Sequence, residues 1–368
     1  MVVMKVLILS LADKRHMPMI APYIDYLKER NIDYDIIRSN RYIYRNEDYI
    51  RKSKHGTVYE INMLFPASLN KLKKVGPFLS FRKKACKIMK KNKYDFIIVW
   101  NENTAALFST YLAVNFKNRY CVNIRDIYSH QIGIKQLVDL AIKCSSFATI
   151  PSPEAETNFP EKTICVFNKD LSLLNMMERR NTIRQENNSP IRITHLGFYH
   201  KVVQGSKDIV DTLGNDVRYQ LIFAGQGFDI EFKKYIDEHH YRNVELYGAF
   251  PYEETAKYLK ETDIINSYYN RFEHPSLRVS FGIKHSYTPM LYIPGLADTD
   301  TCWGRLSKQY NLAYLINSHN LNTLGDDLYK WYMGLDFGEF QKNCDSFNQL
   351  IDNSITNLYS KMDLFLEG

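Results

Sequence analysis

The chain has 368 residues, of which 45% are hydrophobic and 24% are charged. These fractions are typical of a globular protein, so they exclude a disordered, collagen-like or coiled-coil chain. The length favours two domains of ordinary size, each large enough to bury its own core.

The formal net charge of +7 is unevenly distributed along the chain. Residues 1–180 carry 30 Lys and Arg against 17 Asp and Glu, a balance of +13, and the remaining residues have a balance of −6. A basic half indicates an anionic partner such as a nucleotide, a nucleic acid or a membrane surface.

The cysteines and the apolar stretches predict a cytoplasmic protein without disulfides, a metal site or a membrane-spanning helix. The six cysteines form no CxxC pair, and several lie in apolar, strand-like runs. They are therefore interpreted as small buried hydrophobic residues. The N-terminal run MVVMKVLILS contains a lysine and has no cleavage pattern of small residues after it, so it predicts a buried first strand.

In the first half of the chain, short apolar runs alternate with helical periodicity. Because these runs are apolar on both faces, they predict a parallel sheet covered by helices. The alternation predicts a doubly wound, Rossmann-like α/β domain over residues 1–174. The predicted strands are 3–10, 33–38, 96–100, 120–124, 147–150 and 163–167, and the predicted helices are 20–30, 80–91, 104–114 and 135–143.

Residues 175–190 are polar, charged and end at a proline, so we interpret them as a linker. The alternation then restarts and predicts a second Rossmann-like domain over residues 191–323. Residues 324–368 predict a helical tail that packs back toward the N-terminal domain. The predicted strands of the second domain are 191–196, 219–224, 244–247, 263–268, 290–293 and 312–316, and its predicted helices are 207–213, 229–239, 252–260 and 276–286.

Ligands of doubly wound sheets bind at the carboxyl ends of the strands, so the residues that follow strands are site candidates. In the second domain, Gly197 and Lys201 follow the first strand, and Gly225 and Gly227 follow the second. Such glycines let the backbone approach a phosphate, and the lysine adds charge. No G-x-G-x-x-G is present, so glycines of ordinary tight turns remain the alternative interpretation.

A third candidate segment is NRFEHPSLRVSFGIKHSYTPMLYI. Glu273 precedes a predicted helix that Pro275 opens, and it could accept two hydroxyl groups of a ribose or a sugar. Ser276, Arg278 and Lys284, with the amides of the helix N-terminus, could hold a diphosphate. The alternative is a capped surface helix with ordinary charges.

In the first domain, polar residues also follow predicted strands, and we expect them to meet at an interdomain cleft. They are His16, Asn101, Glu102, Asp126 and His130. Asp126 or His16 could orient or deprotonate an acceptor hydroxyl, although each could instead be a structural polar residue.

The segment 71–93 carries ten Lys and Arg, among them Lys83, Lys84 and Lys87. As a helix it would be cationic and amphipathic, with apolar anchors such as Phe81 and Met89, which suits anionic lipid headgroups. A solvated helix face is the alternative. Nucleic acid is disfavoured because no RNP, KH or zinc signature is present.

Taken in order, the motifs resemble those of GT-B glycosyltransferases, in particular the retaining enzymes of glycosyltransferase family 4. The resemblance rests on HLG, AGQG, VELYGAF and FEHPSLRVSFGIKHSYTPML in the second domain, and on YCVNIRDIYSH and ATIPSPEAETNFP in the first. It covers most of the chain. It implies two tandem Rossmann-like domains with a helical tail, a nucleotide-sugar donor, no metal or other cofactor, and a role in bacterial surface polysaccharide biosynthesis.

The sequence departs from the family pattern at three places. The Arg-x4-Lys pair after the first strand of the second domain is not evident, and Lys201 is its substitute. Glu273 matches the first carboxylate of Glu-x7-Glu, but the second has no counterpart around Phe281. The Gly-Gly loop after the first strand of the chain is also missing. These departures leave open a changed donor or a non-catalytic copy.

We therefore expect transfer of a sugar from a nucleotide-sugar to a lipid-linked saccharide of a capsule, exopolysaccharide or O-antigen. The expected reaction retains the anomeric configuration and needs no metal. The donor would meet Glu273 and the glycines and cations of the second domain, and the acceptor would meet the polar residues of the first. The basic helix would rest on the inner face of the cell membrane. The alternatives are a nucleotide-sugar 2-epimerase and a non-catalytic GT-B-like partner subunit.

Overall fold

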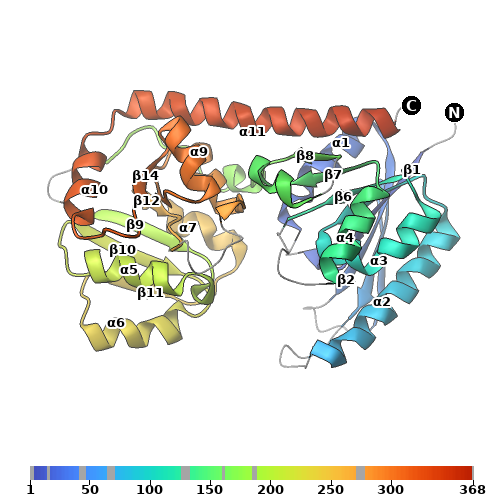
Figure 1. Ribbon diagram of the computed structural model, residues 1–368, viewed down its shortest axis with the longest axis horizontal. Coiled ribbons are helices and arrows are strands. Elements are labelled where there is room, and N and C mark those ends of the chain that lie inside the picture. Colours follow the sequence, from blue (N-terminus) through green and yellow to red (C-terminus); the bar gives the residue numbers. More distant parts are fainter. Residues whose placement is uncertain are drawn as a thin grey trace. The chain divides into compact units, whose positions relative to one another are not determined.

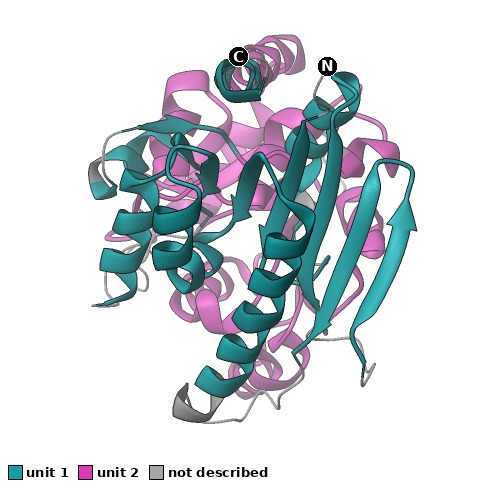
Figure 2. Cartoon of the chain, turned by 90° about the vertical axis from the view of Figure 1, so that its right-hand side faces the viewer, with its two compact units in different colours: residues 1–167, 353–368 teal, residues 168–352 magenta. Residues whose placement is uncertain are grey.

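The computed structural model describes residues 4–14, 17–40, 47–63, 71–125, 133–159, 162–184, 189–270 and 278–366. The chain divides into two compact units, which Figure 2 colours separately. Unit 1 comprises Met1–Phe167 and Asn353–Gly368, and unit 2 comprises Asn168–Asp352. The chain therefore enters unit 1 a second time at its C-terminal end.

Unit 1 is built on an eight-stranded sheet in the order β3-β4-β2-β1-β5-β6-β7-β8. Its strands are parallel except for the edge hairpin of β3 and β4. The central strand β5 is buried along its whole length and has the sequence FIIVW, as expected of a parallel strand covered on both faces. The strands are β1 (Lys5–Ser10), β2 (Asp33–Asn40), β3 (Tyr49–Ser53), β4 (Gly56–Asn62), β5 (Phe96–Trp100), β6 (Tyr120–Asn123), β7 (Phe147–Ile150) and β8 (Thr163–Cys165).

Helices cover both faces of this sheet. Figure 1 shows α2, α3 and α4 side by side, and the rings of Phe81 on α2 and Phe108 on α3 meet edge to face. On the other face, Tyr23 of α1 contacts Trp100 of β5. The helices of unit 1 are α1 (Ala21–Glu29), α2 (Lys71–Asn92), α3 (Glu102–Asn115) and α4 (Ile134–Lys143).

Unit 2 is built on a six-stranded, all-parallel sheet in the order β11-β10-β9-β12-β13-β14. The chain winds outward from β9 in one direction to β11 and then in the other from β12 to β14, as in a doubly wound sheet. The strands are β9 (Ile191–Leu196), β10 (Tyr219–Ala224), β11 (Val244–Tyr247), β12 (Ile264–Asn266), β13 (Gly295–Asp298) and β14 (Ala313–Ile316).

The core of unit 2 includes an apolar cluster under α5 and α10 and another under α7 and α8. The first is rich in aromatic rings, with Phe223, Phe228 and Phe232 in mutual contact. The helices of unit 2 are α5 (Val203–Leu213), α6 (Lys233–His239), α7 (Thr255–Leu259), α8 (Tyr287–Leu291), α9 (Cys302–Tyr310) and α10 (Leu324–Met333), with shorter turns at Tyr199–Lys201 and Ile283–Ser286.

The last helix, α11 (Phe337–Leu366), is continuous and belongs to both units (Figure 1). Its first part contacts unit 2, where Asn348 donates to the carbonyl of Pro289 at 2.7 Å. Its last part contacts α1, where Asp363 accepts from Tyr26 and pairs with Arg30. The predicted C-terminal helical tail is confirmed as α10 and α11. None of the helices that the structure describes is long and apolar enough to cross a bilayer.

Two predicted elements of the second domain are wrong. The apolar run 290–293 was predicted as a strand, but it ends α8, and the strand β13 begins at Gly295. A short apolar run does not distinguish a buried strand from a buried helix. The predicted helix 276–286 is interrupted over residues 279–282, because Gly282 is extended and caps a 3-10 turn that begins at Ile283.

The sequence analysis also missed the hairpin of β3 and β4. All five residues of β3 are exposed, so this edge strand has no buried apolar face that periodicity could reveal. Residues 175–184 and 189–190 of the predicted linker lie in unit 2, where Leu173 and Met177 pack into its second apolar cluster.

Candidate functional site

The carboxyl ends of β9 and β12 mark the point in unit 2 where the winding of the sheet reverses. These two strands are neighbours, and their chain connections leave in opposite directions along the sheet. Open α/β sheets bind ligands in the crevice at such a point. The segments that follow the strands, from Gly197 to Lys201 and from Ser267 to Asn270, are therefore the first place to look for a site.

Gly197 and Gly225 end neighbouring strands in conformations that require glycine. Their φ angles are +147° and +144°, in a region that other residues rarely adopt. A Cβ on Gly225 would lie 1.6 Å from the carbonyl oxygen of Gly197, so the two turns touch through their backbones. This internal contact explains why residue 225 is a glycine. At Gly197 an added Cβ would have no such clash, since its nearest atom would be Nε2 of His195 at 3.7 Å. Gly227, at φ +93°, begins the turn that carries Phe228.

A buried lysine reaches the end of β9 from a distant part of the chain. The turn Ile283–Ser286 places Nζ of Lys284 3.3 Å from the carbonyl oxygen of Leu196 and 3.4 Å from Nε2 of His195. The same ammonium lies 4.3 Å from the centre of the Tyr269 ring. The residue is only 9% exposed, and none of its contacts within the described residues is with a carboxylate.

A second cation lies close enough to Lys284 to act on it. Burial, and next the charge of Lys201, hold the pKa of Lys284 well below the ordinary value of a lysine. Burial and the charge of Lys284 likewise lower the pKa of His195 far below its usual range and that of His285 to about 3. Two lysines and two imidazoles thus gather at one sheet edge, an arrangement that a bound anion would stabilise.

A buried carboxylate holds the segment after β12 in place. Asp208 of α5 accepts from the hydroxyl of Tyr268 and the amide of Asn270, both at 2.9 Å, and from Gln204 at 2.7 Å. Gly205 packs against the same segment, since a Cβ there would lie 3.0 Å from the backbone nitrogen of Asn270. The loop that faces Lys284 is therefore fixed from α5.

At the carboxyl edge of the unit 1 sheet, two of the predicted site residues, Asn101 and Glu102, accept hydrogen bonds from backbone N–H groups. Asn101 caps α3 by accepting from the backbone N–H of Thr104 at 2.9 Å. Its φ of +66° is unusual for a residue other than glycine. The buried carboxylate of Glu102 accepts from the backbone N–H of Arg125 at 3.1 Å. The structural interpretation that the sequence left open therefore accounts for both side chains.

The sequence analysis missed two buried polar residues at the sheet edges. Asn123, at the end of β6, is fully buried, and within the described parts of the chain neither atom of its amide has a hydrogen-bond partner. His195 is likewise buried beside Lys284. A single polar residue closing an apolar strand, as in RYCVN and IRITHL, is the signal that could have found them.

The basic segment forms α2, with Lys83, Lys84 and Lys87 on its exposed side. Lys84 pairs with Asp48, so part of its charge is already balanced. The predicted anchors Phe81 and Met89 are buried in the core of unit 1 and cannot reach a membrane, which corrects that expectation. They face the core because i, i+4 and i+8 positions share one side of a helix. Exposed apolar residues remain at Val75 and Leu79.

Five predicted site residues lie outside the described residues: His16, Asp126, His130, Glu273 and Ser276. Arg278 is described and exposed, and it lies in a 3-10 conformation at the start of the described part of its segment. Its carbonyl oxygen accepts from Arg305 of α9 at 2.6 Å.

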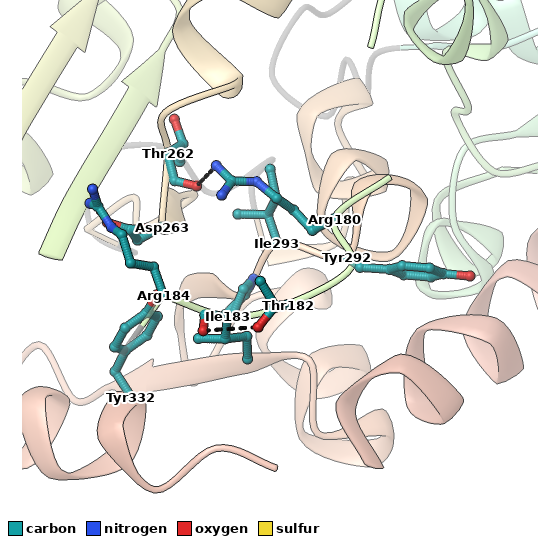
Figure 3. Close-up of a pocket in the computed structure, with 10 residues that line it drawn as sticks. Arg180, Thr182, Ile183, Arg184, Thr262, Asp263, Tyr292, Ile293 and Tyr332 are labelled. Atoms are coloured by element: carbon teal, nitrogen blue, oxygen red, sulfur yellow. Dashed lines mark hydrogen bonds and ion pairs between the residues drawn. The ribbon is translucent and has the colours of Figure 1, made fainter. Parts of the chain in front are cut away.

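A small pocket at the opposite edge of the same sheet is shown in Figure 3. Arg180 donates there to the carbonyl oxygen of Thr262 at 2.8 Å, and Arg184 pairs with Asp263. These arginines attach the segment after residue 177 to the amino ends of β12 and β13. Because ligands of open α/β sheets bind at carboxyl ends, we assign this pocket a structural role.

Comparisons with known proteins extend the description of the fold. No protein-family model and no curated protein matches the sequence. Among solved structures, sucrose-phosphate synthase from Thermosynechococcus elongatus is similar with a TM-score of 0.72 and 11% identity, covering 98% of this chain and 99% of that one. HepE from Anabaena in complex with UDP has a TM-score of 0.65 and 13% identity, covering 98% and 100%.

The catalytic domain of starch synthase IV from Arabidopsis thaliana, bound to ADP and acarbose, has a TM-score of 0.64 and 10% identity, covering 96% of this chain and 99% of that one. At such identities the likeness establishes the fold alone. The chain has the GT-B fold, with two parallel-sheet α/β domains and a C-terminal helix, as its sequence predicts.

Proposed function

We propose that the protein is a glycosyltransferase that binds the diphosphate of a nucleotide-sugar at the carboxyl ends of β9 and β12. The observation that carries this proposal is Lys284, a buried lysine that meets no carboxylate in the described parts of the chain. A buried charge is costly unless it is paired, so an anion is the natural partner of this side chain. Lys201 adds a second positive charge nearby.

The arrangement suits the departure of a nucleoside diphosphate. Negative charge develops on the leaving phosphate, and fixed positive groups in a partly buried site stabilise that charge in the transition state. Lys284 and Lys201 would supply these groups, and the Gly197 turn lets a ligand approach the backbone. We propose that transfer needs no metal and retains the anomeric configuration. Glu273 would bind the donor hydroxyls, and Ser276 and Arg278 would assist.

The similar structures support a nucleotide ligand. HepE was solved with UDP and with UDP and glucose, and starch synthase IV with ADP and acarbose. A chain with this fold, and with a buried lysine at the switch point that meets no carboxylate among the described residues, is expected to bind the same chemical class. The base and the sugar are to be identified by the first experiment below.

For the acceptor we propose a lipid-linked saccharide of a bacterial surface polysaccharide, bound by unit 1. Exposed lysines cluster on α2, and anionic lipid headgroups attract such charge. Lys83 and Lys87 lie on this face, and Val75 and Leu79 leave apolar surface exposed on the same helix. Asp126 or His16 would act on the acceptor hydroxyl, with Asn101, Glu102 and His130 near it.

The donor is tested by thermal shift with UDP, ADP, GDP and their sugar conjugates. One nucleotide should raise the unfolding temperature, since a ligand that binds the folded state stabilises it by mass action. Turnover is then measured with that donor and a membrane extract as acceptor. Conversion of UDP-GlcNAc without an acceptor would indicate the epimerase, and nucleotide binding without turnover until a partner protein is added would indicate the subunit.

The membrane contact is tested by sedimentation with vesicles of phosphatidylglycerol and phosphatidylcholine. Charge reversal of three exposed lysines on α2 should reduce binding at least tenfold, because each is worth about 1 kcal/mol near such a surface. Reversal of exposed lysines of unit 2 is the matched control and should change binding little. Equal losses in both variants would contradict a role for α2. The variants are Lys83→Glu, Lys87→Glu and Lys90→Glu, against Lys233→Glu, Lys234→Glu and Lys257→Glu.

A further inference from the structure

The lysine at the end of β9 has surroundings that disfavour its charged form. Nζ of Lys284 contacts a carbonyl oxygen, an imidazole nitrogen and the face of an aromatic ring. Each is neutral or weakly polar, and the side chain is almost completely buried. A free amine can donate to the carbonyl of Leu196 and needs no counter-ion, whereas an ammonium in this place would have no counter-ion among the described residues.

Among the described residues, the titratable groups that contact Lys284 or act on its pKa carry no negative charge at neutral pH. His195 of β9 and His285 of the same turn are neutral imidazoles. Lys201 brings a positive charge, and burial raises the pKa of the Tyr269 phenol, which keeps it protonated. The buried carboxylate of Asp208 is already engaged by three donors of its own surroundings.

We infer that Lys284 is an uncharged amine in the empty site and takes up one proton from solvent when a diphosphate binds. This inference rests on the proposed nucleotide site. The proton adds to Nζ, and the ammonium so formed donates to a phosphate oxygen and to Leu196. The incoming negative charge offsets the cost of the buried charge and the repulsion from Lys201.

The consequence is a donor affinity that depends on pH over a range where ordinary lysines do not titrate. Between the pKa of Lys284 in the empty site and its pKa in the complex, one proton accompanies each ligand. The dissociation constant then rises about tenfold per pH unit. Below that range the affinity is constant, because the amine is already protonated before binding.

Proton uptake is measured by calorimetric titration with UDP at pH 8 in buffers of different ionisation enthalpy. The wild type should take up about one proton per UDP, and Lys308→Met, which removes an exposed lysine of α9, should behave identically. Lys284→Met should bind UDP more weakly and take up none. Uptake of the same number of protons by Lys284→Met, or none by the wild type, would overturn the inference.

If Lys284→Met binds UDP too weakly for calorimetry, a second variant and a second ligand still test the proton uptake. Lys201→Met removes the repulsion between the two lysines, so the pKa of Lys284 in the empty site rises. The pH above which UDP binding takes up a proton should therefore increase. An unchanged value of that pH would contradict the inference. Inorganic pyrophosphate serves as a second probe that lacks the nucleoside.

The empty protein provides a readout that needs no ligand. A lysine whose pKa is lowered by folding binds fewer protons in the folded state. The wild type should therefore gain stability over Lys284→Met as pH rises from the folded-state pKa toward about 10.4. A thermal midpoint difference that is flat between pH 7 and pH 9 would show that the lysine is charged. Failure of every nucleotide and of pyrophosphate to bind contradicts the proposed function, whereas binding without proton uptake contradicts only this inference.

Discussion

The two parallel sheets of this protein use the polar residues at their carboxyl edges differently. In unit 1, Asn101 and Glu102 bind backbone N–H groups and hold the turns after β5 and β6. In unit 2, Lys284 and His195 contact one another, and no carboxylate among the described residues pairs with the lysine. The difference shows that position at a strand end does not by itself indicate a ligand. A buried basic side chain without a counter-ion among its described neighbours does.

The largest expected effect is a loss of stability at the carboxyl edge of the unit 2 sheet. Gly225→Ala should lower the free energy of unfolding by more than about 3 kcal/mol, since its Cβ would lie 1.6 Å from the carbonyl oxygen of Gly197. Gly282→Ala is the control, because its φ is −77° and its Cβ would meet the nearest atom at 3.7 Å. Urea unfolding compares the two. Equal stability of both variants would contradict the close contact of the two turns.

A slightly smaller loss is expected where α5 fixes the loop that faces Lys284. Asp208→Ala removes a buried acceptor of hydrogen bonds from Tyr268, Asn270 and Gln204 and should cost roughly 1.5–3 kcal/mol. Asp211→Ala, on the same helix, removes an exposed acceptor of two tyrosines and should cost less than about 1 kcal/mol. Thermal unfolding measures both, and a reversed order would show that the loop is held by other contacts.

The smallest expected effect on stability concerns unit 1. Asn123 has two buried amide atoms that meet no partner among the described residues, so Asn123→Leu should leave the unfolding temperature unchanged or raise it. If the amide binds acceptor hydroxyls, kcat/KM should fall about tenfold in the same variant, through loss of one hydrogen bond. Unchanged kcat/KM would mean that the Asn123 amide does not bind the acceptor.

Much of this fold could be predicted because its strands are short, apolar runs. FIIVW, YCVN and FATI are fully buried and can only be central strands between helices. The hairpin of β3 and β4 could not be predicted, since Tyr49–Ser53 is exposed throughout. The prediction of a strand over MLYI was wrong because α8 ends there with Tyr292 in a left-handed conformation, two residues before Pro294 and three before the start of β13.

The candidate site was less predictable because it depends on contacts between distant residues. Lys284 could be selected from its segment, but its approach to His195 and Leu196, 89 and 88 residues away, is a tertiary feature. Likewise, sequence alone does not distinguish Asn101, which caps a helix, from Asn123, whose amide has no partner among the described residues. Both are single asparagines at strand ends.

The central claim is that Lys284 binds the diphosphate of a nucleotide. It is tested most directly by the dissociation constant of UDP, or of the nucleotide selected by thermal shift, for Lys284→Met and Lys308→Met at pH 7. Lys284→Met should weaken binding by roughly 10–100-fold, the value of a charge-assisted hydrogen bond, while Lys308→Met should bind like the wild type. Wild-type affinity in Lys284→Met, with the variant folded, would contradict the account.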